Sequence, residues 1–469
     1  MFMSMKRLIF LLSALGSLNM FPVFAASMND KDDPPYIPAA EPEVRAAIAA
    51  WQDLKFGMFI HWGPYSQWGV VESWSICPEE YDFCMVRPEG MNYFDYVKRY
   101  EALKTTFNPQ QFDPDKWAAA AQYAGMKYVV FTAKHHDGFN MFDTKYSDYK
   151  VTDTYCPFST HPRANIAREI FDAFRARGMM AGAYYSIADW HHDDYWWRYL
   201  PPKDRNINYS PSKFPEKWER FNTFVDNQLD ELTDGSYGPL GILWFDLCDA
   251  STEQRPQWER FARTVRTNQP EIMMVARHQH TIYENYRTPE QRIPDKALDY
   301  PWESCMTMAT QWSYKPNDTY KSARTILSIL VQIVSRGGNL LLNVGPGPNG
   351  DLDPVAYERL REIGDWMQVN GEGIYGTKAV APYKEDKLVY TMKGDYVYAF
   401  YLSDEENPEV PEKITIRSFV PAGGGITFLG YKKSLPWRRT SDGIEIEIPE
   451  PLQDNPPCNY IWGLRFRIR

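Results

Sequence analysis

The feature that most constrains the fold is a regular alternation of short apolar runs with amphipathic stretches. The apolar runs are strand candidates: Phe56–His61, Lys127–Ala133, Met179–Ser186, Gly241–Phe245, Ile272–Ala276 and Asn339–Val344. The helix candidates between them are Pro114–Ala124, Ile166–Arg177, Glu216–Leu232, Thr252–Thr267 and Tyr320–Val334. Strands that alternate with helices in this way predict parallel βα units.

We expect these units to close into a (β/α)8-type barrel, with two further strands near residues 70–75 and 296–303. A doubly wound sheet fits less well, because no G-x-G-x-x-G sequence follows the first strand. A barrel of this kind takes about 250 residues, and the chain has 469. The length therefore leaves room for a smaller second domain.

The pattern changes near residue 375. From Lys378 onward, apolar and polar residues alternate in segments such as KLVYTMKGDYVYAFYL and GIEIEI, which Gly, Pro and Asp separate. This alternation is typical of an antiparallel β-sandwich. We therefore predict an α/β chain with a (β/α)8-like barrel in residues 42–375 and a C-terminal antiparallel β-sandwich in residues 376–469.

The first 25 residues have the parts of an export signal. Lys6 and Arg7 precede the apolar run Leu8–Leu18, and the small residue Ala25 ends the segment. An uncleaved anchor is the alternative, but the run is short for a membrane span. Residues 26–41 are polar and Pro-rich and are predicted to be a linker. We expect an exported protein, periplasmic or secreted, with no membrane span in the mature chain.

Composition excludes two further classes of protein. The net charge is −10 and no basic stretch stands out, so a nucleic-acid partner is not expected. Six cysteines are too few for a disulfide-built scaffold. Cys77 and Cys84 are close enough in sequence to pair in an oxidising compartment, and the spacing of the cysteines does not match a C-x-x-C zinc site.

Histidines gather where predicted strands end. Seven of the eight follow or end a strand candidate or lie in the segment after it: His61, His135, His136, His191, His192, His278 and His280. The carboxyl ends of barrel strands meet at one face, where active sites are built. A metal site formed by His135, His136, Asp137, His191 and His192 is the alternative. Neighbouring residues on an extended segment point to opposite sides, which disfavours that site.

Carboxylates and aromatic residues complete the candidate pocket. Asp246 ends the apolar run Gly241–Phe245, and an acid at the end of a buried strand is either paired or functional. Glu290 and Glu303 lie in segments with aromatic residues nearby, where an apolar wall would raise a carboxyl pKa. Trp, Tyr and Phe make up 15% of the chain, enough for a sugar-binding pocket as well as a core. Two carboxylates in such a pocket suit glycoside hydrolysis.

At these residues the chain resembles the α-L-fucosidases of glycoside hydrolase family 29. The resemblance rests on six motifs in order over about residues 45–375. They are FGMFIHWG (56–63), AKHHDGF (133–139) with FDT (142–144), AYYS (183–186) with DW (189–190), LWFD (243–246), WESCMT (302–307) and GGNLLLNVGP (337–346). The β-rich tail matches the C-terminal sandwich of that family. The resemblance implies a retaining, exo-acting α-L-fucosidase with no metal or organic cofactor.

The resemblance also implies roles for individual residues. Asp246 would be the nucleophile. The substrate-binding residues would be His61, Glu72, Trp74, His135, His136, Tyr184, Tyr185, Trp244 and Arg277. The family has a Glu-Trp-Tyr element where this chain reads Glu72-Ser73-Trp74-Ser75, and it often has Gly after the nucleophile, where this chain has Leu247-Cys248-Asp249. These departures leave the role of Glu72 and the leaving-group specificity open.

The general acid/base has two candidates. The Thr-Pro-Glu at Glu290 resembles one placement in the family, and the Trp-Glu-x-Cys at Glu303 resembles another. We favour Glu290 and expect the other carboxyl to be structural. A fucosylated oligosaccharide or glycoconjugate is the expected substrate. The alternatives are a hydrolase of a related sugar, such as an α-L-galactoside, and a carbohydrate-binding protein without turnover.

Overall fold

The computed structural model describes residues 34–246, 255–277, 279–406 and 408–468. The predicted export signal and the first half of the predicted linker lie outside these residues, as do Leu247, Cys248 and Asp249. In the part of the chain that the structure describes, no helix is long and apolar enough to cross a membrane.

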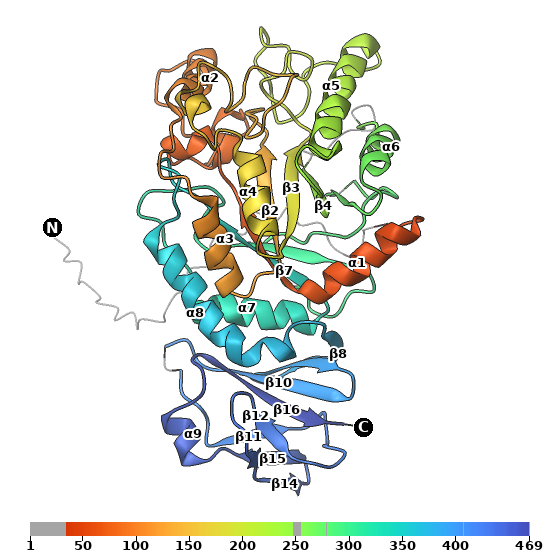
Figure 1. The fold of residues 1–469 in the computed structure, drawn as a ribbon, viewed down its shortest axis with the longest axis vertical. Helices are drawn as coiled ribbons and strands as arrows, with labels where there is room; N and C mark the ends of the chain where they lie inside the picture. Colours follow the sequence, from red (N-terminus) through yellow and green to blue (C-terminus); the bar gives the residue numbers. More distant parts are fainter. Residues whose placement is uncertain (1–33, 247–254, 278, 407, 469) are drawn as a thin grey trace, which may run out of the picture. The chain divides into compact units, whose positions relative to one another are not determined.

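A curved parallel sheet forms the centre of the first region (Figure 1). Its order is β5-β4-β3-β2-β1-β7-β6, and each neighbouring pair is parallel. The strands are β1 (Phe56–Ile60), β2 (Tyr128–Lys134), β3 (Met180–Ser186), β4 (Ile242–Asp246), β5 (Met273–Ala276), β6 (Glu303–Thr307) and β7 (Asn339–Val344). All six strand candidates that were predicted with residue bounds are present. Each observed strand end lies within one residue of the predicted end.

An irregular segment, residues 285–291, takes the place of an eighth strand. The backbone N–H of Asn285 donates to Met274 of β5 (2.9 Å), and the N–H of Gln291 donates to Cys305 of β6 (3.0 Å). The segment thus bonds both edges of the sheet, and the predicted (β/α)8-type fold is confirmed. Pro289 has no N–H to donate, which explains why the segment forms only isolated bridges and no regular ladder.

The two less definite strand predictions had different outcomes. Near 296–303, the strand exists but begins only at Glu303. Near 70–75, the prediction is wrong: residues Glu72–Ile76 form the 3-10 helix η2. Glu72 has φ of 30°, a left-handed backbone conformation that no β-strand contains.

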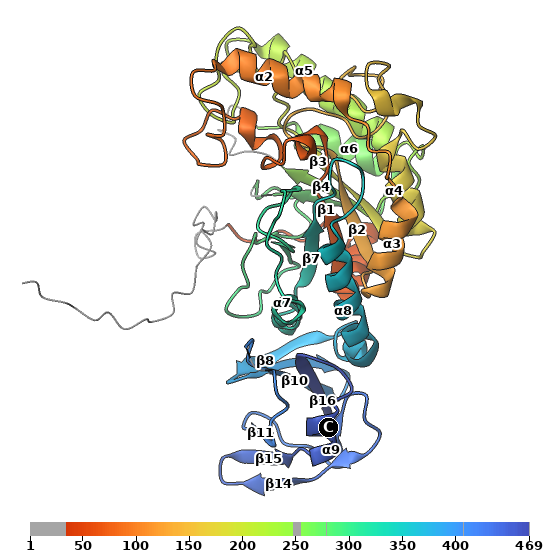
Figure 2. The same ribbon diagram turned by 90° about the vertical axis from the view of Figure 1, so that its left-hand side faces the viewer.

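Helices cover the outside of the strands (Figure 1 and Figure 2). They are α3 (Pro114–Tyr123), α4 (Ile166–Arg175), α5 (Pro215–Thr233), α6 (Trp258–Asn268), α7 (Ala323–Ser335) and α8 (Pro354–Asn370), with α2 (Tyr93–Glu101) in the loop after η2. Three of them begin with Pro, whose missing N–H costs nothing in a first helical turn. The predicted start of α6 at Thr252 lies outside the described residues.

The barrel has its own interior core, separate from the layer between strands and helices. Alternate residues along the strands point inward, among them Phe59, Val130, Trp244 and Leu341. Helix α1 (Pro42–Leu54) supplies Val44, Ile48 and Trp51 to the same cluster. The Trp51 ring stacks on Tyr286 at 4.1 Å between centroids. Helix α1 therefore contributes to the packing of the barrel interior.

The C-terminal region is an antiparallel β-sandwich, as predicted. One sheet has the order β13-β12-β16-β10-β9-β8, and the other has the order β11-β15-β14. The strands are β8 (Lys378–Glu385), β9 (Leu388–Lys393), β10 (Tyr396–Leu402), β11 (Lys413–Ile416), β12 (Ile426–Phe428), β13 (Ser434–Leu435), β14 (Trp437–Thr440), β15 (Gly443–Glu447) and β16 (Ile461–Arg467), with the short helix α9 (Glu450–Asp454). The region has its own apolar core, and the indole of Trp366 on α8 donates to the Ile461 carbonyl (2.7 Å).

Candidate active site

The predicted site residues come mostly from the carboxyl ends of the barrel strands. His61 follows β1, the pair His135 and His136 follows β2, Asp246 ends β4, and Arg277 follows β5. Glu290 lies in the segment that replaces the eighth strand. The parallel arrangement brings residues that are far apart in the sequence to one face.

Asp246 is the centre of this cluster. Its Oδ2 accepts a hydrogen bond from the Tyr184 hydroxyl (2.9 Å) and lies 3.8 Å from His136 Nε2. Arg277 Nη1 donates to both carboxylate oxygens, at 3.3 and 3.4 Å. The Asp246 side chain is 14% exposed. A carboxylate held by Tyr184 and Arg277 and still open on one side is suited to attack a bound molecule.

Arg277 joins the two carboxylates that the sequence singled out. Its Nη2 donates to Glu290 Oε2, while its Nη1 holds Asp246. Burial opposes the charge of Arg277, but the Asp246 carboxylate raises the pKa of the guanidinium above its ordinary value. Arg277 therefore stays charged and fixes Asp246 and Glu290 on the same face of the barrel.

Three buried histidines are held by their Nδ1 atoms. His61 Nδ1 pairs with Asn343 (2.6 Å), His135 Nδ1 with Ser73 (2.6 Å) and His136 Nδ1 with Ser186 (2.6 Å). Burial lowers the pKa of His61 to about 3 and that of His136 to about 4, and it lowers the pKa of His135 well below its ordinary value. All three rings are neutral at pH 7.

Hydrogen-bond chains set which nitrogen carries the proton in two of these rings. The Asn343 amide donates to the Trp312 carbonyl (2.6 Å), so its oxygen accepts from His61 Nδ1–H. The Ser186 hydroxyl donates to the Ala188 carbonyl (2.6 Å), so it accepts from His136 Nδ1–H. His61 and His136 therefore keep an unprotonated Nε2, which can accept a hydroxyl proton.

The turn after β2 explains how two neighbouring histidines reach one site. The rings of His135 and His136 lie 4.4 Å apart. Neighbouring side chains point to opposite sides only on extended backbone, and the chain turns here. Gly138 has φ of 75°, and a Cβ on it would lie 2.1 Å from Asp189 Oδ1. Asp189 pairs with buried Lys134 (3.1 Å), so the turn is fixed from behind.

The metal site that these histidines suggested is not assembled. His191 pairs with Glu101 (2.8 Å) and stacks on Tyr149, away from the His135–His136 pair. His192 accepts from the Asp194 N–H (3.0 Å). Among the described residues, no three His, Cys, Asp or Glu side chains are grouped so that they could hold a metal ion.

Aromatic rings form a wall beside Asp246. Tyr184 stacks on Trp244 (5.5 Å) and on His135 (5.4 Å), and the Arg277 guanidinium lies 5.5 Å from the Trp244 ring. The structure does not bring Tyr185 into this group. Its hydroxyl donates to Gln228 (2.7 Å) on the helix side of β3, because alternate residues of a strand face opposite ways.

Glu303 lies inside the barrel, apart from the Asp246–Glu290 pair. It begins β6, is fully buried, and accepts from the Tyr128 hydroxyl (2.6 Å) and the Trp244 indole (3.2 Å). Burial raises its pKa to about 7. Glu303 is therefore placed to support Trp244, and it is not placed to reach a molecule at the rim.

The η2 segment brings Glu72, Ser73 and Trp74 to the same site in different ways. Glu72 is buried, its Oε1 accepts from the Ser313 N–H (2.7 Å), and its Oε2 has no hydrogen-bond partner among the described residues. Burial raises the Glu72 pKa to about 8. The Trp74 ring meets His136 edge to face at 5.3 Å. Ser73, which the sequence did not single out, positions His135.

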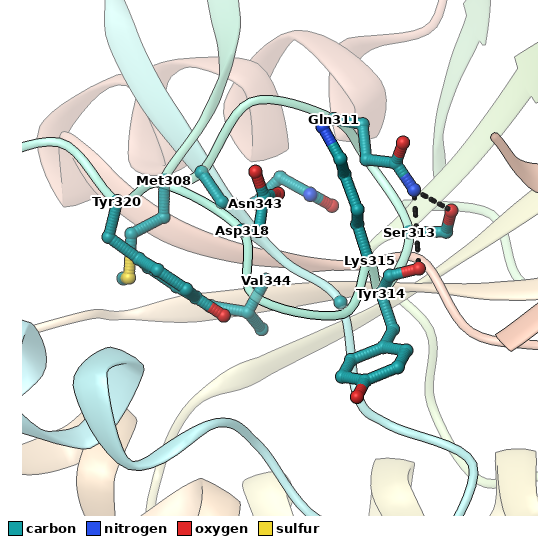
Figure 3. Close-up of a pocket in the computed structure, with 11 residues that line it drawn as sticks. Met308, Gln311, Ser313, Tyr314, Lys315, Asp318, Tyr320, Asn343 and Val344 are labelled. Atoms are coloured by element: carbon teal, nitrogen blue, oxygen red, sulfur yellow. Dashed lines mark hydrogen bonds between the residues drawn. The ribbon is translucent and has the colours of Figure 1, made fainter. Parts of the chain in front are cut away.

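The loop after β6 lines a small cavity next to this site (Figure 3). Its lining includes Ser313 and Asn343, whose bonds to Glu72 and His61 are described above, together with Lys315, Asp318 and Tyr320. The Trp312 ring, in the same loop, lies 5.1 Å from that of His61. The loop thus forms one side of the histidine cluster. Asn343 and Ser186 were missed as functional positions, although both lie in the motifs quoted above.

Two family models match this chain, and together they cover most of its length. The sequence model described as alpha-L-fucosidase matches residues 23–372, and the model of the alpha-L-fucosidase C-terminal domain matches residues 383–467. The chain belongs to the alpha-L-fucosidase family of glycoside hydrolases.

Relatives of this fucosidase family match almost the whole chain. An alpha-L-fucosidase of Branchiostoma floridae is 28% identical over 464 residues, 92% of this chain and 96% of the relative. The solved alpha-L-fucosidase isoenzyme 1 of Paenibacillus thiaminolyticus is 30% identical with a TM-score of 0.75, over 91% of this chain and all of that one. An alpha-L-fucosidase of family GH29 from Bacteroides thetaiotaomicron has a TM-score of 0.72 at 25% identity, over 93% and 97% of the two chains.

Proposed function

We propose that this chain is a retaining, exo-acting α-L-fucosidase that hydrolyses terminal α-L-fucosyl residues from glycans or glycoconjugates. The observation that carries the proposal is the Asp246–Arg277–Glu290 arrangement beside three neutral histidines. Family membership supports the sugar, and the paired carboxylates support the reaction.

In the first step, an Asp246 carboxylate oxygen attacks the anomeric carbon while Glu290 donates a proton to the glycosidic oxygen. The carbon–oxygen bond to the rest of the glycan breaks, and a fucosyl ester forms on Asp246. In the second step, Glu290 takes a proton from water, which attacks the same carbon and frees Asp246. Two inversions give overall retention.

The surrounding residues would bind and orient the sugar. The unprotonated Nε2 atoms of His61 and His136 can accept hydroxyl protons, and burial keeps these rings neutral at pH 7. Trp244 and Trp74 offer apolar faces to the ring. The charged Arg277 guanidinium lies against the Asp246 carboxylate and stabilises its negative charge, the form in which a carboxyl acts as a nucleophile.

Azide rescue of the Asp246→Ala variant tests this proposal. The unmodified protein should hydrolyse an aryl α-L-fucoside, and the variant should lose that activity. Azide should restore turnover and give β-L-fucosyl azide, because a small anion can occupy the space of the missing carboxylate. An azide-insensitive variant would contradict the role of Asp246. Faster hydrolysis of an aryl α-L-galactoside would point to the related sugar, and binding without turnover would point to a carbohydrate-binding protein.

We also propose that residues 1–25 direct export to the periplasm or the medium. The mature chain would then hold the linker 26–41, the catalytic region 42–375 and the C-terminal region 376–469. The charged and apolar parts of the first 25 residues support this. Cell fractionation with N-terminal sequencing tests it: a cytoplasmic protein that retains Met1 would contradict export.

A further inference from the structure

A chain of aromatic rings runs from the candidate active site to the protein surface. It starts at His136, whose ring lies 5.3 Å from that of Trp74. Trp74 meets Phe83 edge to face at 5.7 Å, and Phe83 stacks almost parallel on Tyr81 at 5.3 Å. Tyr81 is 41% exposed. Because His136 lies 3.8 Å from Asp246, this chain begins beside the proposed nucleophile.

The loop that carries Phe83 and Tyr81 is anchored at several points. Glu79 accepts two hydrogen bonds from the Arg205 guanidinium, at 2.7 and 2.6 Å, and that guanidinium lies 4.6 Å from the Trp74 ring. Cys77 and Cys84 are free thiols, both buried, and the Cys77 thiol hydrogen-bonds to Cys84. These contacts therefore hold in place the segment that carries the exposed ring of Tyr81.

The chemistry of this surface suits a neutral sugar ring. An exposed aromatic face packs against the C–H face of a pyranose, and the sugar's hydroxyls remain in water. The exposed residues next to Tyr81 are the acidic Glu80 and Asp82, and they would repel a carboxylated or sulfated sugar. The Glu79 charge is already matched by Arg205.

We propose that Tyr81, supported by Phe83, forms the subsite for the neutral sugar that follows the terminal fucosyl unit. This inference rests on the proposed function, since it takes the fucosyl unit to lie against Asp246. It also takes the remainder of the glycan to leave the pocket along the aromatic chain, which begins at His136, 3.8 Å from Asp246. The subsite makes the enzyme distinguish a fucosylated neutral oligosaccharide from a fucoside without a second sugar.

Two substrates separate this subsite from the catalytic centre. One is α-L-fucosyl fluoride, which has no second sugar. The other is the best-cleaved member of a panel of disaccharides in which fucose is linked to galactose or N-acetylglucosamine. Tyr81→Ala should lower kcat/KM about fivefold more on the disaccharide than on the fluoride, mainly through KM. Tyr81→Phe should keep the unmodified protein's ratio, because the ring is retained.

Tyr155→Ala is the matched control, because Tyr155 is 76% exposed and has no ring contact with the aromatic chain. It should change neither rate. An equal effect of Tyr81→Ala on both substrates, or no effect, would overturn the subsite, and so would an unmodified protein that cleaves the fluoride and none of the disaccharides. An unmodified protein inactive on both substrates would instead contradict the proposed function.

Discussion

Two carboxyl groups of neighbouring segments occupy opposite environments in this barrel. Glu290 lies at the rim, 24% exposed, with its charge matched by Arg277. Glu303 is sealed in the barrel interior, and its partners are the Tyr128 hydroxyl and the Trp244 indole. The first is accessible to a bound molecule and to water, whereas the second is buried away from both. We propose that the same residue type serves catalysis at the rim and packing in the interior.

The largest effect should come from a substitution of Asp246, which Arg277 links to the rim carboxyl Glu290. Asp246→Asn keeps the size of the side chain and removes the proposed nucleophile. We expect kcat on an aryl α-L-fucoside to fall on the order of 10⁴-fold or more. Thermal unfolding of the variant serves as the control for folding. A loss below about tenfold would remove Asp246 from the reaction.

Glu290 and Glu303 can be compared directly with alanine variants. Glu290→Ala should lower kcat by about 10² to 10⁴-fold on a substrate with a poor leaving group, because the leaving oxygen then departs without a proton. On an aryl fucoside with an acidic phenol, the loss should be much smaller. Exogenous azide should then give the α-L-fucosyl azide. Leaving-group dependence confined to a Glu303 variant would reverse the assignment.

The interior carboxyl, Glu303, should make the free energy of unfolding depend on pH. Its pKa of about 7 lies above the ordinary 4.5, so the folded state binds its proton more tightly than the unfolded chain does. This contribution is complete below pH 4.5 and is lost as the pH rises to 7, and it amounts to about 3 kcal/mol.

Glu303→Gln mimics the protonated form at every pH. Between pH 5 and pH 8, its free energy of unfolding relative to that of the unmodified protein should therefore rise. Urea unfolding at the two pH values measures this, with Glu290→Gln as the control. An unchanged difference would place Glu303 in a more hydrated setting than the barrel interior.

The smallest effect is expected when a residue that hydrogen-bonds to one of the buried histidines is replaced. Ser186→Ala removes the acceptor that sets the orientation of His136. We expect KM to rise about fivefold with kcat nearly unchanged, the value of one hydrogen bond. Ser418→Ala, which removes a surface bond to Glu385, is the control. A change in kcat alone would mean that His136 takes part in the chemical step.

The comparison also shows what the sequence could predict. Apolar runs with acids or histidines at their ends sufficed to find most strands, and to place Asp246 and His61 at one face. The choice between Glu290 and Glu303 was harder, because both lie in loop-like sequence near aromatic residues. Whether Glu303 is buried depends on where strand β6 begins. The sequence pattern does not mark Glu303 as the first residue of that strand.

Tyr185 illustrates the same limit on one strand. Tyr184 and Tyr185 are adjacent and identical, so composition cannot separate them. The face of β3 that points into the barrel decides, and that face is set by pairing with β2 and β4. Likewise, residues 285–291 replace a strand without a strand-like pattern, because two edges of the sheet supply their hydrogen bonds.

The configuration of the first sugar released tests the central claim most directly. Proton NMR of a fresh reaction on an aryl α-L-fucoside distinguishes α-L-fucose from β-L-fucose before the two anomers equilibrate. A covalent intermediate on Asp246, formed and broken with Glu290 as acid and base, predicts α-L-fucose first. Initial release of β-L-fucose would mean a single displacement by water and would contradict the account.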